Sequence, residues 1–495
     1  MAVKLATLLH MHQPDYRHPD SGEPVLPWVR LHAVRGYTDV ATYLIETGAQ
    51  ATVNVVPSLL EQLLGYENGA TDEWERLSRI RAEDLSDDQQ AFIRARFFHG
   101  NIRMRQVSDR YQALEAAAKA GEALTAGDVR DIQVWSNLAW MGGVARRAPF
   151  IRQLFAQERG FSHDQLVALM DHQRALVNGV MGLWRQLPQI SCTPYYHPIL
   201  PLLVDFEHAR RSLTFPAEDT VVFQWPEDAL WHLKMARDGV EEMLGFRPVG
   251  LWPSEGAVSP EALRLAKEAG FEWFLTDQAQ LEMADRTAPV DLYRPWAVRD
   301  GPRGLFRDRA LSDKIGFEYQ HWDGEAAARD LLAMADARDV GDDGTIVLAL
   351  DGENPWESYP DAGEGFLTAF FRSGRCVSAA EAAAGPVAGE VTRVHTGSWI
   401  NGDLGVWAGH PEDRRAWRRL AQARLAWEAN GKPESARRHL AAAEGSDWFW
   451  WFGPEFITDD RALFDRLFRE HLKAAWREMG LTPPVNLNTP ILDAG

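Results

Sequence analysis

The chain has 495 residues, of which 45% are apolar, and its 52 basic and 71 acidic side chains give a formal net charge of −19. This length suits a large barrel with an appended domain, and the apolar content is ample for a sizeable core. The acidic balance argues against nucleic acid and anionic membrane as partners, because both attract basic surfaces.

Two further observations concern the compartment. The two cysteines, Cys192 and Cys376, are too few for a disulfide framework or a zinc cluster. The first ten residues contain a short apolar run without a cleavage site, which predicts a strand and not a signal peptide. No window approaches the roughly 20 apolar residues of a membrane span. We therefore expect a cytoplasmic protein with no membrane partner.

Apolar runs predict strands at 3–9, 51–56, 220–224, 248–252, 271–275 and 345–350. Between them, helical spacing over about 60–190 predicts a helix-rich insertion, and three amphipathic helices are expected at 411–430, 433–444 and 459–479. Alternating strands and helices indicate an α/β fold with a parallel sheet, either a barrel or a doubly wound sheet. We expect a catalytic barrel over 1–390 and a helical domain over 391–495 that contributes to the cleft.

Two carboxylates follow predicted strands, each close to a tryptophan. G-L-W-P-S-E contains Trp252 and ends at Glu255, and L-A-L-D-G-E-N-P-W-E contains Asp351, Glu353 and Trp356. A tryptophan ring stacks on a pyranose face, and two carboxylates can break a glycosidic bond. Asp351 as general acid would need a raised pKa, which burial and a neighbouring carboxylate would both produce. The alternatives are a surface-loop glutamate and an Asp-Gly turn.

H-M-H-Q-P supplies His10, His12 and Gln13 directly after the first predicted strand. Strand alternation places both histidines on one face of the sheet. They could donate hydrogen bonds to substrate hydroxyls or bind a metal. The alternative is a pair of histidines that is satisfied by neighbouring carboxylates.

Other candidate binding residues occur in less specific contexts. A sugar subsite could be lined by Tyr196 and His197, and either Asp308 or Asp313 could face the cleft beside Arg307. Trp399 and Trp407, in a glycine-rich loop, could stack on sugars or simply pack the loop. Asp447 and Trp448, in a helical segment, could bind sugar or dock the helical domain on the barrel.

Together these segments resemble glycoside hydrolase family 57. The resemblance is carried by residues 10–14, 252–255, 350–357 and 398–413, with support from 27–32, 54–60 and 444–451. It covers nearly the whole chain, and the D-G-E-N-P-W-E form is most similar to the amylopullulanase-like branch.

The resemblance implies a distorted, TIM-like (β/α)7 barrel with a helical C-terminal domain, acting with retention on α-glucans or malto-oligosaccharides. It implies Glu255 as nucleophile, Asp351 as general acid/base, and neither a cofactor nor a catalytic metal. One departure is Gln189, which stands where the family usually carries a glutamate that is thought to contact substrate.

The primary hypothesis is therefore a retaining α-glucan hydrolase that cleaves α-1,4 bonds, with α-1,6 cleavage left open. A 4-α-glucanotransferase or branching enzyme would use the same glycosyl-enzyme intermediate. A metal-dependent polysaccharide deacetylase would use His10 and His12 as ligands, but it leaves both carboxylate motifs unexplained. A non-catalytic glucan-binding protein would tolerate Glu255→Gln without any change in behaviour.

Overall fold

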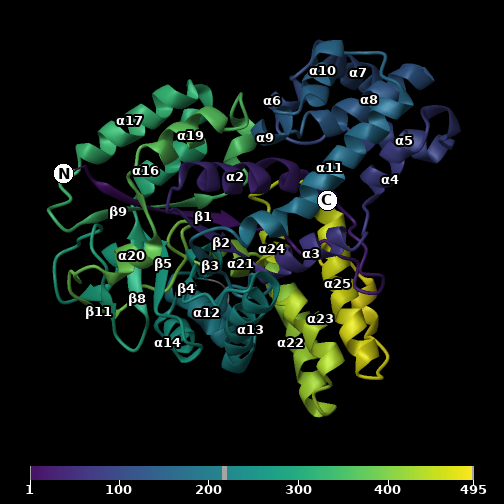
Figure 1. Cartoon of the computed structure of the whole chain (residues 1–495). Coiled ribbons are helices and arrows are strands. Elements are labelled where there is room, and N and C mark those ends of the chain that lie inside the picture. The colour runs from purple at the N-terminus through teal and green to yellow at the C-terminus, as the bar shows by residue number, and fades with distance from the viewer. Residues whose placement is uncertain (1, 215–219, 493–495) are drawn as a thin grey trace.

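The structure is a computed structural model that describes residues 2–214 and 220–492. Seven strands form its central barrel (Figure 1): β1 (Lys4–Met11), β2 (Thr52–Val55), β3 (Ile190–Cys192), β4 (Gly250–Leu251), β5 (Trp273–Asp277), β8 (Arg303–Arg307) and β9 (Thr345–Asp351). Neighbours pair in parallel from β9 through β1 to β8. The Asp308 N–H, just after β8, donates to Val347 O of β9 at 2.8 Å and joins the two ends of the sheet. The fold is the predicted distorted (β/α)7 barrel.

The register of β1 explains where the site forms. His10 lies opposite Asn54 of β2 on one side and Asp351 of β9 on the other. All three are at the C-terminal ends of their strands, and the residues before them are buried apolar side chains. The C-terminal face of the barrel therefore gathers the polar residues that follow each strand. A short strand, β10 (Cys376–Val377), pairs with the beginning of β1.

Helices cover the outside of the barrel, among them α2 (Thr38–Thr47), α13 (Pro226–Leu244), α14 (Pro260–Glu268), α17 (Gly324–Asp336) and α19 (Glu364–Arg372). Local sequence explains their limits. The Ser259 hydroxyl accepts from Ala262 N at 3.1 Å and caps α14, while Pro260 occupies its first position. Gly270, at φ 91°, follows the end of this helix.

The helix-rich segment projects from one side of the barrel (Figure 1). It comprises α3 (Pro57–Glu67), α4 (Glu73–Arg79), α5 (Asp87–Arg96), α7 (Asp109–Lys119), α8 (Ala126–Leu138), α10 (Pro149–Gln157) and α11 (His163–Trp184). Tyr111, Trp135 and Leu154 belong to a separate hydrophobic core within it. A buried ion pair ties it to the helix before α2, since Arg30 Nε lies 2.7 Å from Asp72 Oδ2.

From about residue 405 onward the described chain is helical, as predicted: α21 (Gly405–Ala408), α22 (Pro411–Ala429), α23 (Glu434–Ala443), α24 (Ser446–Trp450) and α25 (Arg461–Glu478). Arg424 of α22 lies 2.6 Å from Asp228 of α13, and both side chains are buried. A small sheet pairs β11 (Glu390–Arg393) with β6 (Asp285–Arg286) and β7 (Ala297–Val298). The domain division at 390/391 stays a prediction.

One predicted strand is wrong. Residues 220–224 have no regular structure, although Val221 and Phe223 are buried. Phe223 O accepts from Phe206 N, and the Phe223 ring packs against Trp417. The apolar pattern there reflects packing against helices and not sheet pairing. Across the described residues, every helix is too short or too polar to cross a bilayer.

Candidate active site

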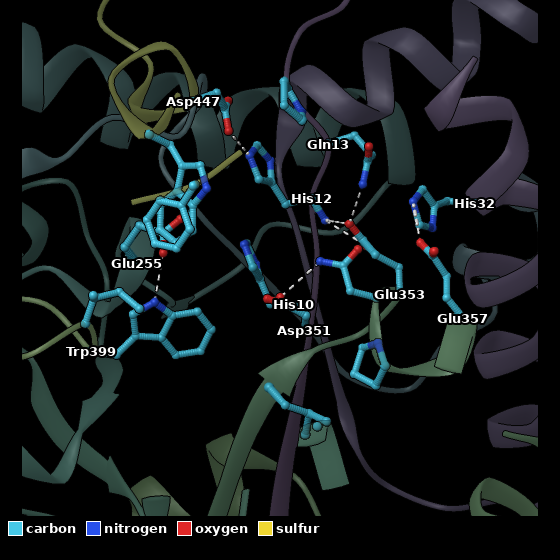
Figure 2. A pocket seen from close by; sticks show the side chains of 18 of the residues that line it. His10, His12, Gln13, His32, Glu255, Asp351, Glu353, Glu357, Trp399 and Asp447 are labelled. Atoms are coloured by element: carbon cyan, nitrogen blue, oxygen red, sulfur yellow. Dashed lines mark hydrogen bonds and ion pairs between the residues drawn. The ribbon is translucent and has the colours of Figure 1, made fainter. Parts of the chain in front are cut away.

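A cavity of about 1070 Å³ opens at the C-terminal ends of the barrel strands. Its wall contains eight of the residues that the sequence singled out: His10, His12, Gln13, Glu255, Asp351, Glu353, Trp399 and Asp447 (Figure 2). They come from β1, from the loops after β4 and β9, and from the C-terminal third of the chain. Segments more than 400 residues apart in the sequence thus share one cavity.

Glu255 is held in an uncommon backbone conformation. The chain leaves β4 through Trp252 and Pro253, and Glu255 adopts φ 57° and ψ 23°, the left-handed region that non-glycine residues rarely occupy. Trp399 holds it twice, because its backbone N–H donates to Glu255 O at 3.0 Å and its indole Nε1–H donates to Oε2 at 2.8 Å. Such strain persists where surrounding contacts over-determine it.

Burial opposes ionisation of both Glu255 and Asp351. Burial, and next the negative charge of Asp351, raise the pKa of Glu255 to about 8, against the opposing hydrogen bond from Trp399. Burial raises the pKa of Asp351, while a hydrogen bond from Asn354 Nδ2 at 3.1 Å opposes this shift. Because the charge of Asp351 acts on Glu255, the two carboxyl groups are expected to titrate as a pair.

Three histidines stand beside this pair. His10 Nδ1 is hydrogen-bonded to Asn54 Oδ1 at 2.7 Å, and its Nε2 to His197 Nε2 at 3.2 Å. His197 Nδ1 is bonded to Ser446 Oγ at 2.8 Å and lies 4.0 Å from Glu255 Oε1. Burial and the neighbouring His12 lower the pKa of His10 to about 3 and that of His197 well below its usual value. His10 and His197 are therefore neutral near pH 7.

His12 stacks on His197 with ring centroids 3.8 Å apart and bonds to Asp447 Oδ1 at 2.8 Å. Ligand atoms of these three residues lie within 4.8 Å of one another, which is close enough for a metal set. However, an imidazole lone pair lies in the ring plane, and these planes are only 15° from parallel. Two stacked rings do not aim at one ion, and both nitrogens of His10 are occupied. The geometry does not favour the deacetylase hypothesis.

Glu353 faces the protein more than the cavity. Its carboxyl accepts from Gln13 Nε2 at 2.9 Å and from the His12 N–H at 3.1 Å, and burial raises its pKa well above the usual value. It packs on the π-helical turn η1 (Ala33–Tyr37), where a Cβ on Gly36 would meet Glu353 Cα at 3.0 Å. Glu353 thus ties the end of β1 to the segment that carries Asp351.

Four tryptophans that were expected to bind sugar are buried instead, which corrects that expectation: Trp252, Trp356, Trp407 and Trp448. Trp356 Nε1 donates to Gly352 O and Trp448 Nε1 to Ala442 O, so both serve the local backbone. Trp252 packs beneath Trp399, with ring centroids 5.1 Å apart. Of the predicted stacking residues, Trp399 is the one placed on the cavity wall.

Tyr196, His197 and Asp308 also lie off the cavity wall. Tyr196 packs on Tyr195, and His197 is covered by His12. The Asp308 carboxyl instead accepts from Leu311 N at 3.0 Å and caps α16 (Arg309–Asp313). Of the two aspartates, Asp313 is the one that lines the cavity. Gln189 precedes β3, so it lies at the opposite end of that strand from the site.

The cavity wall also contains residues for which the sequence predicted no role. They include Trp28, His32, Arg309, Asn401, Trp450 and Phe456. Trp28 and His32 belong to the P-W-V-R-L-H segment, and Trp450 belongs to the W-F-W-W run. Arg307, already noted, places its guanidinium 5.0 Å from the Trp399 ring and 2.7 Å from Asp277 Oδ2.

Comparisons with known proteins agree with this architecture. The α-amylase AmyC from Thermotoga maritima has a TM-score of 0.62 at 14% identity, over 97% of this chain and 93% of that chain. A GH57 branching enzyme from Thermococcus kodakaraensis has a TM-score of 0.59 at 15% identity, over 97% and 90%. The 4-alpha-glucanotransferase from Thermococcus litoralis has a TM-score of 0.54 at 16% identity, over 98% and 60%. At such identities these structures show the fold alone.

A search of curated proteins finds no match. The family model of glycosyl hydrolase family 57, in contrast, matches residues 6–380, which is most of the chain and includes both carboxylates that face the cavity. The chain belongs to glycosyl hydrolase family 57.

Proposed function

We propose that this protein is a retaining enzyme acting on α-glucans, with Glu255 as nucleophile and Asp351 as general acid and base. The observation that carries the proposal is that both carboxyl groups line one cavity at the C-terminal face of the barrel. The raised pKa of Asp351 supports its role, because a general acid must hold its proton. Glu255 must be ionised to attack, so in the reactive state the pair holds one proton, on Asp351.

In this mechanism Glu255 attacks the anomeric carbon while Asp351 protonates the departing glycosidic oxygen. A covalent glycosyl-enzyme forms, and Asp351, now ionised, removes a proton from the incoming water or hydroxyl. Trp399 orients Glu255 by its hydrogen bond to Oε2. The neutral His197 beside Oε1 adds no positive charge that would weaken the nucleophile.

We propose hydrolysis of α-1,4 bonds as the main reaction, in the manner of the amylopullulanase-like branch that the D-G-E-N-P-W-E motif resembles. Structures of similar fold include an alpha-amylase, a branching enzyme and a 4-alpha-glucanotransferase. Transfer to a sugar hydroxyl is therefore the second candidate, since it uses the same intermediate. A cytoplasmic location stays a prediction.

The test is the set of products formed from purified maltoheptaose, resolved by chain length, with Glu255→Gln as the inactive control. Shorter products alone would establish hydrolysis of an α-1,4 bond. Longer products alongside shorter ones would assign a transferase. No reaction with wild type on maltoheptaose or pullulan would contradict the proposed substrate class.

A further inference from the structure

A second polar pair lines the same cavity at a distance from the nucleophile. His32 ends α1 (Trp28–His32), and Glu357 lies in α18 (Pro355–Ser358). Figure 2 shows the pair on the far side of Glu353 from Glu255. His32 Nε2 and Glu357 Oε1 are 3.6 Å apart. The proposed mechanism uses neither residue.

His32 lacks the hydrogen-bond partners that a buried imidazole normally has. It is 4% exposed, and its Nδ1 is enclosed by protein without a hydrogen-bond partner within residues 2–214 and 220–492, so Nε2, which faces Glu357, is the atom that a ligand could meet. The 3.6 Å distance to Glu357 exceeds a normal hydrogen bond. Burial, and next the charge of Arg35, lower the pKa of His32 to about 3, so the ring is neutral and offers one donor and one acceptor.

The Glu357 carboxyl accepts a hydrogen bond from the Asn101 backbone, and a carboxyl group can accept further bonds on the side that lines the cavity. Its side chain is 18% exposed, and burial raises its pKa to about 7 against the opposing charge of Arg35. The Arg35 guanidinium donates to Trp356 O at 2.8 Å. Because buried polar groups are normally hydrogen-bonded, a His32 Nε2 that lies 3.6 Å from its neighbouring carboxyl at a cavity wall indicates a ligand that completes the pair.

The reaction geometry indicates which part of the substrate lies beside His32 and Glu357. Asp351 protonates the glycosidic oxygen, so the leaving sugar extends past Asp351, away from the side of Glu255. The far wall that carries His32 and Glu357 lies in this direction (Figure 2). In the second half-reaction an acceptor sugar would occupy the same place, because that step retraces the first.

We propose that His32 and Glu357 form a binding subsite for the leaving-group and acceptor sugar, each bonding to a pyranose hydroxyl. Adjacent hydroxyls of one pyranose both donate and accept, as does a neutral imidazole beside a carboxyl group. This inference rests on the proposed function and adds to it the place where the acceptor is held.

The test compares a substrate that has a sugar leaving group with one that does not. Maltopentaose places sugar beyond Asp351, whereas α-maltosyl fluoride releases only fluoride. We expect Glu357→Gln to lower the ratio of kcat/KM for maltopentaose to kcat/KM for the fluoride by about ten-fold, the loss expected for one hydrogen bond to a charged or polar group. His32→Gln should lower the same ratio.

The matched control is Asp313→Asn, which alters a carboxyl on the Arg307 side of the same cavity. It should change kcat/KM for both substrates by the same factor. Equal losses on both substrates with Glu357→Gln and with His32→Gln, or no loss at all, would overturn the subsite.

Failure of the proposed function itself would look different, because wild type would then cleave neither substrate. In that case, calorimetric titration with maltotriose tests whether His32 and Glu357 bind sugar. Weaker binding by Glu357→Gln and His32→Gln than by wild type would retain the subsite as a sugar site. Equal affinity would overturn it, and circular dichroism of each variant checks that it is folded.

Discussion

Glu255 combines an ionisable carboxyl group with surroundings that oppose its charge. Its pKa, about 8, lies above the usual 4.5 because of burial and the nearby Asp351. Between these two pH values the unfolded chain releases the proton while the folded chain retains it. The free energy of unfolding therefore falls as the pH rises from about 4.5 to about 8. The proposed nucleophile is therefore maintained at a cost in stability.

Glu255→Gln removes that titration, so we expect the variant to gain stability relative to wild type as the pH rises. The gain should reach about 2 kcal/mol between pH 5 and pH 7.5, measured by urea unfolding at each pH. The control Glu122→Gln changes an exposed helix-flanking glutamate and should show no such trend. A pH-independent difference between Glu255→Gln and wild type would contradict the raised pKa.

Trp399 donates its indole N–H to Glu255 Oε2, a bond that favours the ionised nucleophile. Trp399→Phe keeps a ring beside Arg307 but removes the donor. We expect kcat to fall about ten-fold and the acidic limb of the pH–rate profile to move to higher pH. A higher KM with an unmoved acidic limb would instead assign Trp399 to sugar stacking alone.

At the scale of elements, the π-helical turn η1 supports the segment that carries Asp351. Gly36 faces Glu353, and an added Cβ would meet its Cα at 3.0 Å, too close without a backbone shift. We expect Gly36→Ala to cost about 1–3 kcal/mol of stability and to lower kcat/KM, because the 351–357 segment must move.

Gly179→Ala is the matched control for this change. Gly179 lies exposed within α11, where an added Cβ meets nothing within 4 Å. Alanine there should stabilise the protein by about 0.5–1 kcal/mol and leave the kinetics as in wild type. Urea unfolding and kcat/KM on one substrate check both variants. Equal behaviour of the two would show that Gly36 does not support the site.

Some strands of the barrel could be predicted from the sequence and others could not. Residues Lys4–Met11 and Thr345–Asp351 were predictable as strands, because a parallel strand buried on both faces is a continuous apolar run. The strands Ile190–Cys192 and Arg303–Arg307 were missed, because they are short and contain serine, glycine or arginine. Short segments take their structure from the neighbours with which they pair.

The residues of the candidate site also separate into those that the sequence could predict and those that it could not. Glu255, Asp351 and the paired histidines were identifiable because polar groups directly after buried strands must reach the open face of a barrel. The roles of loop tryptophans were not, since Trp399 faces the cavity while Trp407, eight residues later in the same loop region, is fully buried. Only tertiary packing decides which ring a loop exposes.

At the scale of the whole molecule, buried charge joins the C-terminal helices to the barrel. Asp228 of α13 pairs with Arg424 of α22, and both are almost fully buried. We expect Asp228→Asn to cost about 3 kcal/mol, because it removes the buried counter-charge of Arg424 and leaves only the more exposed carboxylates of Glu227 and Glu428 beside it. Glu227→Gln is the control, since Glu227 contacts the same arginine at 3.3 Å but is 56% exposed. It should cost less than about 1 kcal/mol in the same urea unfolding experiment. Equal losses would contradict a buried origin of the effect.

The cavity wall includes His10 from the first strand and both Asp447 and Phe464 from the final helices. During synthesis, every strand of the barrel and both proposed catalytic carboxylates have emerged by residue 351, yet one wall is still missing. Catalytic competence is then among the last properties that the nascent polypeptide acquires. In a refolding experiment, the return of activity would time the docking of the final helices and lag behind the return of barrel structure.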